Sequence, residues 1–252
     1  MNIQCEPLVS IITPLYNSEK FVAETIESVL AQTYTNWEML IVNDCSKDNG
    51  AKIVEEYVKK DKRIKLFNNE KNMGVSFTRN RAIDLSKGKY IAFLDSDDVW
   101  HKEKLEKQIK FMEDKNLSLT YTSYTKMNEN GSLRGTINIP KKLNYEELLK
   151  NCLIGFLTAV YKKEGLEECK FIKSKAEDYI FWLNMLKKID FAYGIQESLA
   201  YYRVSSNSRS SNKIDIVKFH WKIYREVEKL NLIESVYYYI IYIFRGIKRY
   251  IK

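Results

Sequence analysis

Short apolar runs alternate with longer amphipathic segments over the first hundred residues, and this alternation restricts the fold more than any other feature. Four runs have the length and β-branched content of buried strands: residues 8–15, 37–42, 64–67 and 90–94. Three segments with apolar side chains at helical spacing separate them: residues 19–32, 48–60 and 76–86. This succession predicts an α/β fold, a Rossmann-like and mostly parallel sheet flanked by helices.

The pattern is less regular beyond residue 98. Further helices are expected at residues 102–115 and 176–188. Further strands are expected at residues 117–127, 134–139, 191–195 and 199–204. The chain from residue 214 onward is predicted to be helical, with a break near residues 231–233. We therefore expect one α/β domain over residues 1–212, with halves 1–98 and 99–212, followed by helices over residues 213–252.

Composition excludes several classes of protein. With 252 residues, 45% of them hydrophobic and 29% charged, the chain is expected to be globular. Only His101 and His220 are present, so a zinc site with paired histidine ligands is not expected. The sequence contains no G-x-G motif and no P-loop. Four widely spaced cysteines without a C-x-x-C motif predict reduced cytoplasmic thiols.

The formal net charge of +8 favours anionic partners: nucleic acid, phosphorylated small molecules or an acidic membrane surface. Most of this excess lies from residue 199 onward, where 11 basic and 4 acidic residues occur. Residues 236–252 combine aromatic residues with Lys and Arg, which is typical of helices that lie on an anionic membrane surface. Packing of this segment against the rest of the protein is the alternative. Its apolar stretch, residues 236–244, is too short to span a bilayer.

Acidic residues follow the fourth predicted strand directly: Asp95, Ser96, Asp97 and Asp98. In open parallel sheets, ligands bind beyond the carboxyl ends of the strands, so this segment is expected to lie at the site. Neighbouring carboxylates repel one another, and Mg²⁺ or Mn²⁺ would relieve the repulsion while binding substrate phosphates. If the segment is extended, Asp95 and Asp97 point to the same side. Alternatively, residues 96–98 only cap the helix that begins near residue 101.

Three other residues are candidates because they follow strands or lie near strand ends. Asp44 follows the second predicted strand and could accept a hydrogen bond from a nucleobase or ribose, or could cap the next helix, a role that Asp48 can also fill. Tyr16 could stack on a base or be a core residue. Arg79 could reach a diphosphate or be an ordinary surface arginine.

Together these segments resemble glycosyltransferase family 2, whose members have the GT-A fold. The resemblance is carried by VSIITPLYN at 9–17, the segment at 25–48 that ends in IVNDCSKD, NMGVSFTRNRAI at 72–83, and GKYIAFLDSDDVWHKEKLEKQ at 88–108. Further on, AEDYIFWL at 176–183 resembles the acidic pair of the family at the head of a helix.

The resemblance implies inverting, metal-assisted transfer of a sugar from a nucleotide-sugar, usually UDP-linked, to a hydroxyl group. It implies nucleotide-sugar contacts for Thr13, Pro14, Tyr16, Asn17, Asp44, Arg79, Asp95 and Ser96. It also implies that Asp97 ligates Mn²⁺ or Mg²⁺ and that Asp178 is the general base, with Glu177 beside it. An aspartate needs a raised pKa for that task, which Glu177 could provide. The alternative for this acidic pair is stabilisation of a helix start.

One segment departs from the family pattern. Family members often have a histidine after the last strand, near a Tyr-Arg pair, whereas this chain has Ser205 there. Arg203 and Arg209 are candidates to close over the diphosphate instead.

The resemblance predicts an enzyme of surface polysaccharide biosynthesis that uses a saccharide or lipid-linked acceptor. It would be cytoplasmic, or peripheral on the inner face of the cytoplasmic membrane. The alternatives are an inactive member that only binds sugar nucleotide, and a nucleic-acid-binding protein. No nucleic-acid-binding motif occurs, and nucleic acid is not expected as a partner.

Overall fold

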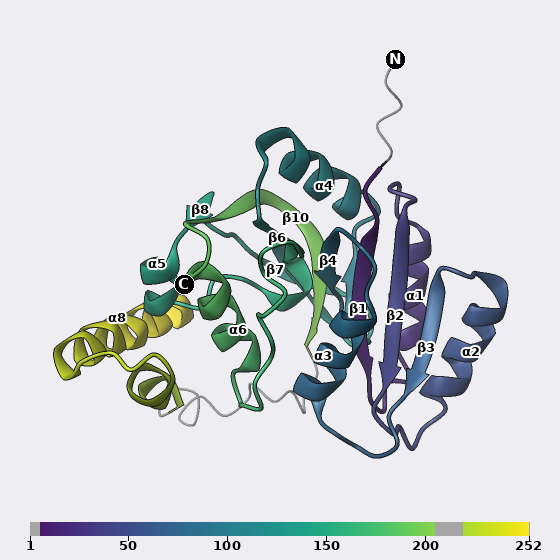
Figure 1. The fold of residues 1–252 in the computed structure, drawn as a ribbon, viewed down its shortest axis with the longest axis horizontal. Coiled ribbons are helices and arrows are strands. Elements are labelled where there is room, and N and C mark those ends of the chain that lie inside the picture. The colour runs from purple at the N-terminus through teal and green to yellow at the C-terminus, as the bar shows by residue number, and fades with distance from the viewer. Residues whose placement is uncertain (1–5, 205–218, 252) are drawn as a thin grey trace.

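A single mixed sheet runs through the protein (Figure 1). The computed structural model describes residues 6–204 and 219–251. In spatial order the strands are β3 (Ile64–Asn68), β2 (Trp37–Asn43), β1 (Val9–Leu15), β4 (Tyr90–Phe93), β9 (Val160–Lys162), β6 (Leu119–Asn128), β10 (Ala192–Val204) and β5 (Val99–Trp100). Two further strands pair off this path: β7 (Leu133–Ile137) with β6, and β8 (Lys142–Leu143) with β10.

The first four strands are parallel, as the sequence predicts. Beyond them the sheet is mixed, because β9 is antiparallel to both β4 and β6, whereas β6 and β10 are parallel. The helices are α1 (Val22–Leu30), α2 (Gly50–Lys60), α3 (Val75–Leu85), α4 (Lys104–Lys115), α5 (Tyr145–Lys150), the short η1 (Phe156–Thr158), α6 (Glu177–Leu186), η2 (Ile223–Val227) and α8 (Leu232–Ile251).

Both faces of the parallel part are buried, which explains why its strands are apolar without alternation. Ile11 on β1 lies in a cluster that includes apolar residues of α1 and α4. The next residue, Ile12, lies in a second cluster that includes residues of α3 and α6. Successive side chains of a strand point to opposite faces, so helices must cover both sides.

The second half differs from the prediction in several elements. The two strands expected at residues 191–195 and 199–204 form one strand, β10, with register irregularities between Ile195 and Tyr201. The polar residues between the two predicted strands interrupt the apolar pattern, so the sequence did not show that the strand is continuous. The elements α5, β8, η1 and β9 were not predicted, because each is too short to show a period. Residues 205–212 and the start of the expected helix at 214 lie outside the described residues.

The C-terminal helix α8 begins at Leu232, where the break was predicted, and packs beside α5 at the end of the molecule opposite α2 (Figure 1). Tyr242 stacks on His220, with ring centroids 3.8 Å apart. Arg245 forms an ion pair with Glu147 of α5 at 3.3 Å. One side of α8 therefore packs against the protein. Within the part of the chain that the structure describes, no helix is long and apolar enough to cross a membrane.

Lys104, in the first turn of α4, is completely buried. Its Nζ donates to Gln108 Oε1 and lies 4.3 Å from the centroid of the Trp100 ring. Burial lowers the pKa of Lys104 well below its ordinary value, because the ammonium loses its hydration. The unfolded chain therefore binds more protons than the folded one between the two pKa values, and stability rises with pH over that range.

We expect Lys104→Met to remove this pH dependence. Consider the pH range between the pKa of Lys104 in the folded chain and its pKa in the unfolded chain. As the pH rises through this range, the free energy of unfolding of the native protein should increase, relative to that of the variant, by up to about 1.4 kcal/mol per pH unit. Urea unfolding at pH 7, 8 and 9 measures the difference. Lys110→Met, at an exposed position on the same helix, is the control and should keep the native slope. Parallel profiles for the native protein and the Lys104 variant would contradict this account.

Candidate active site

The acidic segment after β4 forms a turn and not an extended stretch. The backbone N–H of Asp98 donates to the carbonyl of Asp95 at 3.1 Å. The expectation that Asp95 and Asp97 project to the same side of an extended chain was therefore wrong in its geometry. The two carboxylates nevertheless interact, because Asp95 contributes to the raised pKa of Asp97.

The segment does not cap the following helix. Helix α4 begins at Lys104 with Glu103 at its N-cap position, and the cap has no side-chain hydrogen bond. Asp98 is buried and accepts the backbone N–H of Arg203 on β10 at 2.8 Å. Ser96 is also buried, and its Oγ donates to Ser18 Oγ at 2.8 Å. Asp98 and Ser96 thus hold the turn in place, which leaves Asp95 and Asp97 as its more accessible carboxylates.

Asp97 has the electrostatic character of a cation ligand. Burial first, and then the charge of Asp95, raise the pKa of Asp97 to about 6. A divalent cation at this carboxylate would stabilise its ionised form. Among the described residues, no group of three or more His, Cys, Asp or Glu side chains could hold a metal ion alone.

Arg79 joins the two acidic parts of the site. Its guanidinium donates to Asp95 at 2.8 Å and to Glu177 at 3.3 Å. It also lies 3.7 Å from the centroid of the Phe156 ring, and only 5% of Arg79 is exposed. The Asp95 turn and the head of α6, far apart in the sequence, are therefore brought together by one buried cation. In this structure Arg79 binds carboxylates through its two terminal nitrogens.

Asp178 lies in the first turn of α6 and is half-buried. Removal of its carboxylate from water raises its pKa, Asp95 adds to the increase, and Arg79 opposes it. Burial, and not the neighbouring Glu177, is thus the main cause, since Glu177 pairs with Arg79. The N-cap residue of α6 is Ala176, without a side-chain cap. Both carboxylates nevertheless lie in the first turn, where negative charge favours the helix start, and Asp178 Oδ1 accepts the backbone N–H of Tyr179 at 2.8 Å.

Asp44 anchors the loop between β3 and α3. Its buried carboxylate accepts the backbone N–H groups of Met73 and Gly74 and the side-chain amide of Asn69, each at 2.8 Å. It does not cap α2, because Asp48 accepts the N–H of Gly50 there. The sequence reasoning missed this positioning role, since it depends on a loop that follows a different strand.

The residues at the end of β1 and just after it contact the segment that follows β2. Asn17 adopts a left-handed conformation with φ of 51° and joins the ends of β1 and β2: its N–H donates to Ser46 Oγ, and its Oδ1 accepts the N–H of Lys47. Tyr16 is 45% exposed, as a stacking platform requires. Thr13 is buried, and its Oγ1 has no hydrogen-bond partner. Pro14 is half-buried.

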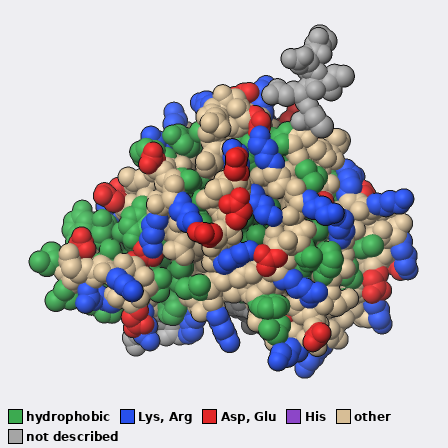
Figure 2. All heavy atoms as spheres, in the orientation of Figure 1, with side chains coloured by type: hydrophobic (Ala, Val, Ile, Leu, Met, Phe, Trp, Pro, Cys, Tyr) green, Lys and Arg blue, Asp and Glu red, His purple; other side chains and the backbone are tan. Residues whose placement is uncertain are grey.

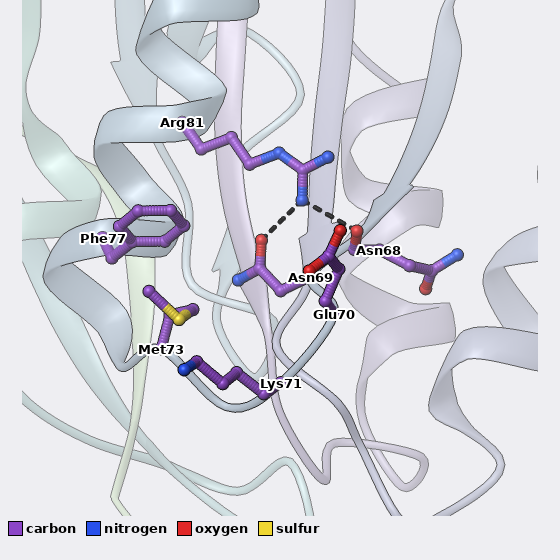
Figure 3. Close-up of a pocket in the computed structure, with 7 residues that line it drawn as sticks. All are labelled: Asn68, Asn69, Glu70, Lys71, Met73, Phe77 and Arg81. Carbon is purple, nitrogen blue, oxygen red and sulfur yellow. Dashed lines mark hydrogen bonds between the residues drawn. The ribbon is translucent and has the colours of Figure 1, made fainter.

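A cavity of about 380 Å³ opens beside the same loop (Figure 3). It is lined by Asn68, Asn69, Glu70, Lys71, Met73, Phe77 and Arg81. Arg81 donates to the carbonyl of Asn68 and to Asn69 Oδ1, so Asn69 connects the cavity wall to Asp44. The sequence alone did not single out Asn69 or Arg81. It also missed Phe156, which lies in a region without a recognisable pattern.

Arg203 contacts other parts of the protein through its whole guanidinium. Its guanidinium is buried, pairs with Glu24, and donates to the backbone carbonyls of Asp97, Asn128 and Glu129. The hypothesis that it closes over the diphosphate is therefore wrong for this conformation, because β10 carries it into the interior beneath the acidic turn. Ser205 and Arg209 lie outside the described residues.

Comparison with known proteins identifies the family. The family described as "Glycosyl transferase family 2" matches residues 10–168. TuaG of Bacillus subtilis (strain 168), named for teichuronic acid biosynthesis, is 41% identical over 247 residues, which are 97% of this chain and 98% of that protein. An Escherichia coli protein, UDP-Glc:alpha-D-GlcNAc-diphosphoundecaprenol beta-1,3-glucosyltransferase WfgD, is 42% identical over 96% of this chain and 95% of its own length.

Solved structures agree on the fold. TarS of S. aureus (residues 1–349, in complex with UDP-GlcNAc) superposes with a TM-score of 0.74 at 24% identity, over 93% of this chain and 70% of that one. Mannosyltransferase PcManGT from Pyrobaculum calidifontis, in complex with GDP-Man and Mn²⁺, gives a TM-score of 0.70 at 16% identity, over 90% and 66%. The predicted fold and enzyme class are thus confirmed, and the chain belongs to glycosyltransferase family 2 as a glycosyltransferase with the GT-A fold.

Proposed function

We propose that this enzyme transfers a sugar with inversion from a UDP-sugar to a hydroxyl of a lipid-linked saccharide, in the biosynthesis of a surface polysaccharide. Two relatives support this proposal by what their names state: one is assigned to teichuronic acid biosynthesis, and one transfers glucose from UDP-Glc to a diphosphoundecaprenol-linked sugar. The TarS structure with the same fold contains UDP-GlcNAc.

The observation that carries the proposal is the bridge made by Arg79. It binds Asp95 beside the proposed metal ligand and Glu177 beside the proposed base, at 2.8 and 3.3 Å. A glycosyl transfer needs positive charge near the leaving diphosphate and a proton acceptor near the attacking hydroxyl. The bridge holds the two acidic segments on one buried guanidinium, and this proximity suits the reaction.

The residues present suit a divalent cation. Asp97 would hold Mn²⁺ or Mg²⁺, because its carboxylate is half-buried, has a raised pKa and lies close to Asp95. When bound, the cation would offset negative charge on the diphosphate as a Lewis acid. PcManGT, of the same fold, was solved with Mn²⁺.

The protein's own residues divide the remaining work. Asp178 accepts the proton of the attacking hydroxyl, which its raised pKa favours. Glu177 keeps Arg79 in place between the two acidic segments. The donor lies along the strand ends, against Thr13, Pro14, Tyr16, Asn17, Asp44, Arg79, Asp95 and Ser96. Asp44 acts there in part through the loop it anchors; among the described residues its Oδ2 accepts one hydrogen bond, from the Gly74 N–H, and a carboxylate oxygen can accept a second.

Ligand-induced thermal shift tests the donor class. In the presence of Mn²⁺, UDP and UDP-sugars should raise the melting temperature by about 5–10 °C at a concentration of about 100 times Kd. GDP- and dTDP-sugars at the same concentration are the controls and should give clearly smaller shifts. An equal or larger shift with GDP- or dTDP-sugars would sink the assignment to UDP.

A lipid-linked acceptor also has a consequence for location. The lipid part of such an acceptor remains in the bilayer, so the active site must reach substrate at the membrane surface. We therefore place the enzyme peripherally on the inner face of the cytoplasmic membrane. At that membrane surface the enzyme, with its donor bound, would bind the lipid-linked acceptor.

A further inference from the structure

Helix α8 presents an unbroken row of exposed apolar side chains along one side. This row, called here the apolar face of α8, consists of Ile233, Val236, Tyr237, Ile240 and Phe244. Ile233 is 83% exposed and Phe244 is 73% exposed. The intervals of three, one, three and four residues place all five on one side of a helix. Figure 2 shows hydrophobic side chains gathered at the end of the molecule where α8 lies.

Tertiary contacts on the opposite side fix the rotation of the helix. Ser235 is buried, and Tyr238 and Tyr239 pack against the hydrophobic core. Tyr239 also meets Trp221 edge to face, with ring centroids 5.3 Å apart. These residues already anchor α8 on the protein. The apolar face of α8 therefore cannot turn inward unless their contacts are lost. Packing of the tail, which the sequence left as an alternative, therefore accounts for one side of α8 and leaves the other side uncovered.

Charge along the helix is unequal. From Leu232 to Phe244, Glu234 is the only charged residue. The last eight residues, 245–252, contain four basic residues and no acidic residue. The helical backbone continues to Ile251, and Ile247 and Ile251 repeat the apolar spacing in the sequence. An apolar row followed by a cluster of cations matches a surface with an apolar interior and anionic headgroups.

We propose that the apolar face of α8 is a docking surface for an anionic lipid bilayer, on which the helix lies in the plane of the membrane. We choose a bilayer over a second copy of the chain because of the positive charge of residues 245–252. Two copies that paired in parallel through α8 would bring these like-charged ends together. The proposal also rests on the proposed function, which puts the acceptor in a membrane. Docking would hold the active site beside that acceptor.

Vesicle flotation with the full chain tests this surface. The protein should float with vesicles of phosphatidylglycerol and phosphatidylcholine, and binding should fall at least about tenfold with phosphatidylcholine alone. The triple variant Ile233→Ser, Ile240→Ser and Phe244→Ser should also lose at least about tenfold in binding to the anionic vesicles. The matched control replaces three exposed apolar residues outside α8 with Ser, namely Leu85, Leu133 and Ile172, and should bind like the native protein.

Equal flotation of the two triple variants would overturn the proposal. So would a dimer in light scattering that the α8 variant disrupts, combined with no vesicle binding by the native protein. The UDP-induced thermal shift of each variant, measured without lipid, separates this inference from the proposed function. If the shift is absent from the native protein but flotation follows the prediction, the donor assignment fails and the docking surface stands.

Discussion

The variant Asp178→Asn should bind UDP like the native enzyme and lose transfer by about 100- to 10,000-fold in kcat, the contribution expected of a general base. Asparagine preserves the shape of the side chain, and its carbonyl can still accept the Tyr179 N–H that Asp178 Oδ1 accepts at 2.8 Å. It cannot take a proton from the acceptor hydroxyl. Steady-state transfer and isothermal titration with UDP measure the two properties separately.

The control for this variant is Asp114→Asn, at an exposed position on α4 that should leave kcat unchanged. The native enzyme should also lose kcat as the pH falls through the pKa of Asp178, because only the ionised carboxylate acts as a base. Burial raises that pKa, so the loss should begin at a higher pH than an ordinary aspartate would give. Turnover within threefold of native in Asp178→Asn, roughly the scatter of such measurements, would remove Asp178 as the base.

Asp97→Ala should abolish the dependence of UDP affinity on a divalent cation. With the native enzyme, EDTA should weaken UDP binding by about 10- to 100-fold or more, because the diphosphate charge would lose its counterion. In the variant, titrations with Mn²⁺ and with EDTA should give the same weakened affinity. Isothermal titration calorimetry reports both values directly.

Asp114→Ala is the matched control and should retain the full effect of EDTA. A second outcome is informative as well, because Asp95 Oδ1 already pairs with Arg79 and Asp97 is the carboxylate proposed to bind the cation. If EDTA leaves the UDP affinity of the native enzyme unchanged, Asp97 does not serve a metal. The raised pKa of Asp97 would then reflect only burial and the charge of Asp95.

The sequence predicted where some residues of the candidate site lie, but not which groups they contact. Carboxylates directly after a buried strand must lie at the carboxyl edge of a parallel sheet, and the structure has Asp44 and Asp97 at the ends of the parallel strands β2 and β4. The hydrogen-bond and ion-pair partners of the site residues could not be predicted from the sequence. Asp44 binds backbone N–H groups after a different strand, and Arg79 is buried between two carboxylates. Hydrogen-bond and ion-pair partners depend on which strands become neighbours, which local patterns do not state.

For the C-terminal helix α8, too, the sequence indicated one part and the structure supplied the other. Its helical character and its excess of aromatic and basic residues were visible in the sequence, and so was the choice between core packing and a membrane surface. The structure shows that Tyr238 and Tyr239 face the protein whereas Ile233, Ile240 and Phe244 do not. Both groups are apolar, so hydrophobicity alone could not distinguish them.

The amino-acid sequence by itself determined the α/β architecture and the parallel strands of the first half, because hydrophobic periodicity is a local property, and its motifs carried the resemblance to the family. Tertiary structure decided three further things: that the Asp95 segment is a turn, that Arg79 bridges it to α6, and which side of α8 is exposed. Each of these depends on contacts between segments distant in the chain. Such contacts are set by the packing of the whole sheet and its helices, and no single segment encodes them.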